Sequence, residues 1–189
     1  MNEEPAPVRD SAGTAFTDLI AAIGSKRLPP VDLWHPTHCG DSDMRIAADG
    51  IWWHAGTPIG RPELVQLFST ILRREADGSF VLVTPGEKLD IAVDDAPFVA
   101  IEATVAGEGA DAMIAFRLNT GDHVVAGAAH ALRVETAVDG TPRPYLHVRA
   151  GLEALVARAV FYQLAEVALA ADPPGVWSGG VFFAFGSAA

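Results

Sequence analysis

The amphipathic pattern between residues 62 and 74 constrains the fold of this chain most. Apolar side chains recur there at the i, i+3, i+4, i+7 and i+8 spacing of one helix face; they are Leu64, Leu67, Phe68, Ile71 and Leu72. Pro62 suits a first helical turn, and Arg73 and Arg74 suit the negative end of the helix dipole. Two short alternating runs around Asp49-Gly50 precede it, and this dipeptide favours a tight hairpin turn. We therefore predict a hairpin, a proline-containing loop and a helix over residues 43–74.

A series of short strands follows the polar break at residues 75–79. Seven segments are rich in alternating apolar residues and are separated by turn-forming Gly, Asp, Asn and Pro; they cover residues 80–84, 89–93, 98–106, 113–118, 123–126, 131–136 and 145–148. Because the connections between them are short, we expect antiparallel pairing.

Two further helices are predicted, one near each end of the chain. Phe16, Leu19, Ile20 and Ile23 form a short apolar stripe. From Gly151 to Ala170 apolar residues lie all round the helical wheel, which predicts a helix buried on most sides. Arg158, Tyr162 and Glu166 form one polar ridge on it, either its solvent side or a cluster that faces another domain or a ligand.

A repeated order of elements suggests how the chain is organised. The order strand, Asp-Gly turn, strand, arginine and helix occurs twice, with Arg61 and Arg149 in corresponding places. This favours an α+β fold with a duplicated hairpin-plus-helix unit. We expect an N-terminal α+β domain over residues 1–78 and an antiparallel roll closed by a C-terminal helix over residues 79–189. The junction of two such units is a natural pocket.

Composition and charge exclude several classes of function. The net charge of −11 argues against a sequence-independent grip on nucleic acid, which requires many Lys and Arg at the phosphates. The N-terminal residues are acidic where a signal peptide is basic and then apolar, and no run approaches the length of a membrane span. The single cysteine, Cys39, fits a reducing compartment. We expect a cytoplasmic protein without a cofactor, and a homodimer is the commonest assembly open to it.

The loop at residues 31–40 carries the residues that favour an enzyme. His35, His38, Cys39 and the nearby Asp41 are candidates for a metal-free or metal-assisted hydrolase. A tetrahedral zinc site needs four ligands, or three and a water, and no second Cys or His pair stands at a suitable spacing. A Cys39 nucleophile partnered by His54 or His130 has no local signature either. The residues favour a non-catalytic role, with the hydrolase as an alternative.

An ordered set of motifs resembles one bacterial family. The strings CGDSDMRIAADGIWWHAGTPIGRPELVQLFSTIL, LVTPGEKLDIAVDDAPF, FRLNTGD, PYLHVRAGLEALVARAVFYQLAE and GVWSGGVFFAFG are similar to the family called domain of unknown function 1285. The resemblance implies a duplicated α+β core whose C-terminal part is pleckstrin-homology-like. It also implies a site for a nucleotide-like molecule at the junction of the two parts, and a role in signal transduction. His54 stands where a tyrosine is common in the family.

The candidate ligand-binding residues follow from chemistry within these strings. Arg61 and Arg149 are expected at helix N-termini, which favour anions. An aromatic ring is expected to stack on a base, acidic residues to accept hydrogen bonds from its amino group, and further cations to bind phosphate. The full candidate set is Trp52, His54, Arg61, Glu87, Lys88, Asp95, Arg149, Arg158 and Tyr162. A third hypothesis is a protein-interaction module that uses the aromatic tail, residues 177–185.

Overall fold

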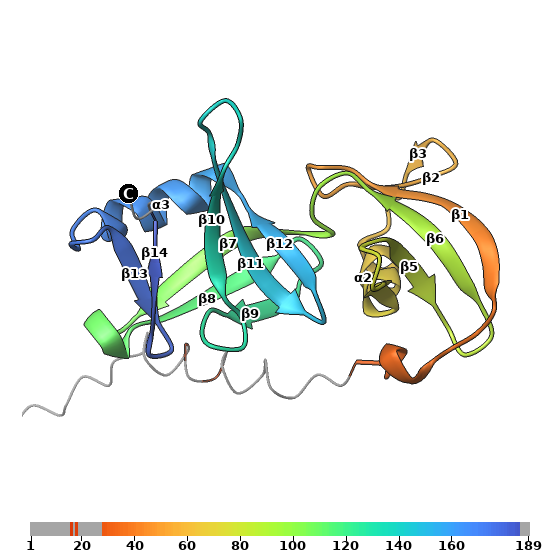
Figure 1. Cartoon of the computed structure of the whole chain (residues 1–189), viewed down its shortest axis with the longest axis horizontal. Helices are drawn as coiled ribbons and strands as arrows, with labels where there is room; N and C mark the ends of the chain where they lie inside the picture. Colours follow the sequence, from red (N-terminus) through yellow and green to blue (C-terminus); the bar gives the residue numbers. More distant parts are fainter. Residues whose placement is uncertain (1–15, 17, 19–27, 186–189) are drawn as a thin grey trace, which may run out of the picture.

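The computed structural model describes residues 16, 18 and 28–185 and shows a mostly β protein of two domains (Figure 1). Each domain is built on a six-stranded sheet, ordered β3-β2-β1-β6-β5-β4 in the first and β10-β11-β12-β7-β8-β9 in the second. The α+β class expected from the sequence is confirmed in this coarse form. The helix predicted around Phe16 to Ile23 lies largely outside the described residues.

The first domain wraps its sheet around one helix. Its elements are η1 (Val31–Leu33), β1 (His38–Ile46), β2 (Trp52–His54), β3 (Thr57–Pro58), α2 (Pro62–Thr70), β4 (Leu72–Arg74), β5 (Phe80–Val83) and β6 (Lys88–Val93). The hairpin predicted at Asp49-Gly50 joins β1 to β2, and β1 also pairs with β6 in parallel.

The second domain closes its sheet with a helix and a small hairpin. Its elements are β7 (Phe98–Ala106), η2 (Gly109–Asp111), β8 (Met113–Leu118), β9 (His123–Val125), β10 (Leu132–Thr136), β11 (Pro142–Arg149), β12 (Leu152–Val156), α3 (Arg158–Ala168), β13 (Gly175–Ser178) and β14 (Val181–Ala184). All seven predicted strands are present, as β5 to β11. The pairing is not wholly antiparallel, because β12 returns beside β7 in parallel.

Helix α2 is shorter than predicted, and the face that it buries is not the predicted one. It ends at Thr70, and Leu72 to Arg74 form strand β4. Its inward side consists of Val65 and Phe68, which pack against the core, and of the fully buried Ser69. Leu67, which the spacing places on the apolar helix face, is 57% exposed, so it does not belong to the core as that face predicts. Leu72 matches the helical spacing of the apolar residues only by coincidence, because it lies beyond the end of α2, in strand β4.

The segment from Gly151 to Ala170 contains a strand and a helix instead of one long helix. Leu152, Ala154 and Val156 are buried in alternation, the period-2 pattern of β12. Helix α3 begins only at Arg158 and buries Val160, Phe161, Leu164 and Ala168. Arg158, Tyr162 and Glu166 lie on its exposed side, which confirms the solvent-side interpretation of the polar ridge.

The chain passes from one sheet to the other between Val93 and Phe98. The polar break at residues 75–79 is instead the turn between β4 and β5, where the Glu75 N–H donates to the Ser79 carbonyl at 2.9 Å. This differs from the division predicted after residue 78. The buried side chains form one cluster that runs through both domains, from Ile46 and Trp52 to Phe116 and Phe183. No helix in the described part of the chain is long and apolar enough to cross a membrane.

Candidate ligand site between the two domains

The hairpin turn of the first domain docks on the second domain through Asn119. The Asn119 side-chain amide donates to the Gly50 carbonyl at 3.0 Å, and its oxygen accepts from the Val99 N–H at 3.0 Å. Gly50 is buried and has a φ of 83°, a conformation that suits glycine. One side chain therefore ties the β1–β2 turn to the β8–β9 turn.

A second link joins Arg149 to the end of helix α2. The Arg149 guanidinium donates to the Ser69 carbonyl at 2.6 Å and lies 5.1 Å from the centre of the Phe98 ring. Burial lowers the pKa of Arg149, and the charge of Asp122 opposes that shift. The cation stands at the negative end of the helix dipole, where it is favourable.

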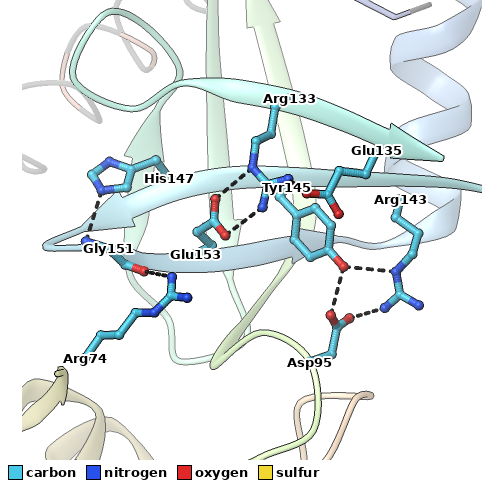
Figure 2. Close-up of polar contacts among 9 residues, drawn as sticks. All are labelled: Arg74, Asp95, Arg133, Glu135, Arg143, Tyr145, His147, Gly151 and Glu153. Carbon is cyan, nitrogen blue, oxygen red and sulfur yellow. Dashed lines mark hydrogen bonds and ion pairs between the residues drawn. The ribbon is translucent and has the colours of Figure 1, made fainter. Parts of the chain in front are cut away.

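Figure 2 shows a third link, from Arg74 to the turn after β11. Arg74 Nη1 donates to the Gly151 carbonyl at 3.2 Å, and the Gly151 N–H donates to His147 Nε2 at 3.3 Å. His147 Nδ1 lies 3.0 Å from the Ala129 carbonyl, so it carries the proton and Nε2 is free to accept. The imidazole thus holds the turn that receives Arg74.

The linker between the sheets is tied down by Asp95 (Figure 2). Its carboxylate accepts a hydrogen bond from the Tyr145 hydroxyl at 2.8 Å and pairs with Arg143, whose Nε also donates to the same hydroxyl at 2.9 Å. Burial, and then the hydrogen bond to Asp95, raise the pKa of Tyr145, while Arg143 opposes them. Asp95 is therefore occupied by a structural cluster and is not free to receive a base.

We predict that Tyr145 ionises above the ordinary tyrosine pKa of about 10. The chain has two tyrosines, so in Tyr162→Phe an alkaline titration of tyrosinate absorbance reports Tyr145 alone. The raised folded-state pKa means that the unfolded chain releases this proton first, and stability should fall as pH rises above about 10. A midpoint at or below 10 would contradict the cluster.

A cleft of about 610 Å³ opens between the domains beside the Asn119 link. The first domain contributes the β1–β2 turn, the start of β2, the loop before α2 and the first turns of α2, and the second contributes the end of β8 and the β8–β9 turn. The lining residues are Asp49, Gly50, Ile51, Trp52, Ile59, Gly60, Pro62, Glu63, Val65, Gln66, Arg117, Asn119, Thr120 and Gly121. Its volume falls within the range of about 300–1,000 Å³ typical of ligand sites.

The charges around this cleft are mixed. Glu63 and Asp49 line it, as does Arg117, whose Nε donates to Glu102 at 2.8 Å. Arg61 stands between the lining residues Gly60 and Pro62 and is exposed, and its side chain forms no hydrogen bond or ion pair within the described part of the chain. The first turn of α2 has no side-chain cap. The cleft thus offers carboxylates together with cations and a helix N-terminus.

Of the predicted ligand residues, Trp52 lines this cleft and Arg61 stands between two of its lining residues. Trp52 is only 1% exposed, so its ring is a core side chain and offers no open face for stacking. Its indole Nε1 is buried without a hydrogen-bond partner in the structure described. Arg61 precedes α2 as expected, whereas Arg149 ends strand β11, and strand β12 separates it from helix α3.

The other candidates lie elsewhere. Lys88 is 3.7 Å from Glu75, and Glu87 closes the β5–β6 turn by accepting from the Thr84 N–H at 2.9 Å. His54 is an exposed residue at the end of β2. Arg158 donates to the Tyr162 hydroxyl at 2.9 Å, and both line a separate cavity of about 250 Å³ within the second domain. The predicted cations therefore do not converge on one cavity.

The loop predicted at residues 31–40, which carries the candidate hydrolase residues, is formed by η1, a connecting segment and the beginning of strand β1. His38 Nε2 lies 2.9 Å from the Asp90 carboxylate of the neighbouring strand β6. Cys39 is part of strand β1, and His35 lies in the segment between η1 and β1. Within the described residues, no three His, Cys, Asp or Glu side chains gather closely enough to hold a metal ion.

The sequence interpretation missed the contribution of the β8–β9 turn. Asn119, Thr120 and Gly121 belong to the string FRLNTGD, which contributed to the family resemblance but received no site assignment. From the sequence, these turn-forming residues predict only a break between two strands. Only the tertiary structure shows that this turn faces the first domain's helix across the cleft.

Comparisons with known proteins agree with this two-part organisation. The family model "Domain of unknown function (DUF1285), N-terminal domain" matches residues 29–96, and "Protein of unknown function (DUF1285), C-terminal domain" matches residues 97–185. A DUF1285 family protein from Silicibacter pomeroyi DSS-3 is 48% identical, with a TM-score of 0.78, over 88% of this chain and 93% of that one. Another, from Shewanella baltica OS155, is 25% identical, with a TM-score of 0.52, over 65% and 90%. No curated protein matches the chain.

Proposed function

The chain belongs to the DUF1285 family, and from that premise we propose that it is a non-catalytic regulatory protein that binds a small nucleotide-like anion in the cleft between its domains. The observation that carries the proposal is the cleft of about 610 Å³ lined by both domains. Neither domain alone forms this site.

The mixed charge of the cleft suits a ligand that carries both an anion and hydrogen-bond donors. Arg117 and the uncapped first turn of α2 line the cleft, and Arg61 immediately precedes that turn; together they supply the positive groups that favour phosphate. Glu63 and Asp49 are acceptors for the amino group of a base, and Gln66 is able to donate or accept. A nucleotide carries both kinds of group, whereas a simple inorganic anion would leave the carboxylates without a favourable role.

A regulatory role follows from the position of the cleft. Gly50 and Asn119 line it and also form the hydrogen bond that joins the domains. A ligand that contacts both sides would favour the closed arrangement, because it binds that state better than a separated one. The pleckstrin-homology-like character of the second domain, a part in signal transduction and a cytoplasmic location remain predictions alongside this proposal.

A thermal-shift screen against nucleotides, cyclic dinucleotides and inorganic phosphate tests the proposal. A ligand at a hundred times its Kd should stabilise the protein by about 2.7 kcal/mol. We expect Arg61→Ala to weaken binding by about 1.5–3 kcal/mol, since a charge-assisted hydrogen bond is lost, and to leave the Tm of the free protein nearly unchanged because Arg61 is exposed.

Arg45→Ala is the matched control, because Arg45 is another exposed arginine of the first domain and pairs with Asp94 away from the cleft lining. It should bind the ligand as the native protein does. Equal weakening in both variants would indicate general electrostatics, and the absence of a shift with every compound would overturn the proposed site.

A further inference from the structure

A second cavity lies in the second domain and is lined in part by α3 and β13, which lie on the side of that domain away from the first domain in Figure 1. It measures about 320 Å³ and is enclosed by the end of β7, the loop before η2, the C-terminal half of α3 and strand β13. Its lining is almost wholly apolar and includes Val105, Leu164, Val167, Val176 and Trp177; Glu108 is the charged exception. We refer to it as the α3–β13 groove.

The groove is bordered by apolar side chains that the fold leaves in solvent. Val105 is 44% exposed, Val167 is 54% exposed and Trp177 is 38% exposed. Leu169, at the end of α3, is 74% exposed. Apolar residues scattered singly on a surface need no explanation, but several around one apolar hollow are typical of a docking surface.

Hydrogen bonds hold strand β13, which forms one wall of the groove, against the rest of the second domain. The Ser178 hydroxyl, which is fully buried, accepts from the Ile114 N–H at 2.8 Å and donates to the Ala126 carbonyl at 2.7 Å. The Gly179 N–H donates to the Ala112 carbonyl at 3.0 Å. These bonds fix β13 against β8 and the η2 segment, so the hollow is preformed and a partner need not order it on binding.

Within the two described stretches that form the groove, the charged residues have one sign. The two stretches that form it, residues 101–116 and 159–185, contain no Lys or Arg. Glu108 lines the groove, and Asp111 and Asp172 stand next to its lining residues Ala112 and Ala171 in the chain. All three carboxylates are exposed and form no ion pair within the described residues. An apolar hollow with an acidic margin is complementary to an apolar stripe with basic residues beside it.

We propose that the α3–β13 groove docks an amphipathic helix of a partner protein, with apolar residues on one face and Lys or Arg along its edges. Helices bind grooves in this way through anchors at i, i+3 or i+4, and i+7. The charge argues against a second copy of this chain as the occupant, because two acidic margins and two net charges of −11 would repel each other. This inference does not depend on the ligand proposed for the cleft.

Fluorescence anisotropy with a labelled amphipathic peptide of leucine and lysine tests the proposal on the full chain. We expect saturable binding at physiological ionic strength and none by a leucine–glutamate peptide of the same length. Val167→Lys should weaken binding at least about tenfold, because it places a cation in the apolar lining of the groove. Val138→Lys, at a fully exposed valine in the β10–β11 turn, adds the same charge and should not change the affinity.

Equal affinities of the two variants, or no binding by the native protein, would overturn the proposal. Two further measurements identify other occupants. A dimer in light scattering that Val167→Lys dissociates would assign the groove to a second copy, and a fall of several degrees in the Tm of Val167→Lys would show that the chain covers the groove itself. Either result would also overturn it.

Discussion

Gly50→Ala is expected to lower the free energy of unfolding by about 2–5 kcal/mol, although it adds a single methyl group. Two effects add: an alanine at a φ of 83° costs about 1–2 kcal/mol, and overpacking costs about 1–3 kcal/mol more. An added Cβ would lie 2.6 Å from Asn119 Nδ2 and 2.7 Å from Val99 Cγ2. The substitution therefore pushes the two domains apart where Asn119 joins them. Denaturant unfolding measures the loss.

Gly140→Ala is the matched control for this prediction. Gly140 occupies the corresponding Asp-Gly turn of the second domain with a φ of 82°, and a Cβ there would meet no atom within 4 Å. It should cost only the backbone term of about 1–2 kcal/mol. If both variants lost the same stability, the domain contact at Gly50 would have no energetic weight. A smaller added loss in an Asn119→Ala background would localise the effect to that side chain.

The positions of tight turns in this chain could be predicted from the sequence, but the tertiary contacts that these turns make could not. Asp49-Gly50 and Asp139-Gly140 both indicated tight turns, and both are hairpin turns in the structure. The two dipeptides are identical, yet only the first is buried against another domain. Nothing in a dipeptide encodes which surface it meets, so the domain contact appears only once the β8–β9 turn is placed.

The helix predictions were wrong where a helix and a strand, whose apolar residues repeat with different periods, follow each other directly in the sequence. The stripe from Leu64 to Leu72 crossed from α2 into β4, and the apolar run from Leu152 to Leu169 crossed from β12 into α3. Short strands carry only two or three alternations, too few to outweigh a longer helical pattern that continues from them. The strands bounded by clear turns, from β5 to β11, were predicted correctly.

The candidate site was predictable in its location more than in its residues. A junction of two units was expected to form a pocket, and a cleft is present there, beside Arg61. The expected symmetry between Arg61 and Arg149 is absent because β12 intervenes before α3. As a result, Arg149 reaches the opposite end of helix α2 from Arg61, and its role becomes structural.

Arg149→Met is expected to destabilise the protein by about 2–5 kcal/mol. The variant loses a charge-assisted hydrogen bond to Ser69, a cation–π contact with Phe98 and a favourable charge at the C-terminus of α2. Replacing a buried ion pair by apolar groups is often neutral, but here the partner is a backbone carbonyl that remains. Ser69 is fully buried, so water does not replace the lost donor without rearrangement.

Two comparison variants separate these contributions in chemical denaturation. Arg45→Met removes a solvent-exposed pairing with Asp94 and should cost little stability. Arg149→Lys keeps the charge but loses the planar guanidinium that lies over Phe98, so its stability should fall between those of the native protein and Arg149→Met. If Arg149→Met were as stable as Arg45→Met, the desolvation that lowers the pKa of Arg149 would cancel its contacts, and the domains would be held together by the Asn119 link instead.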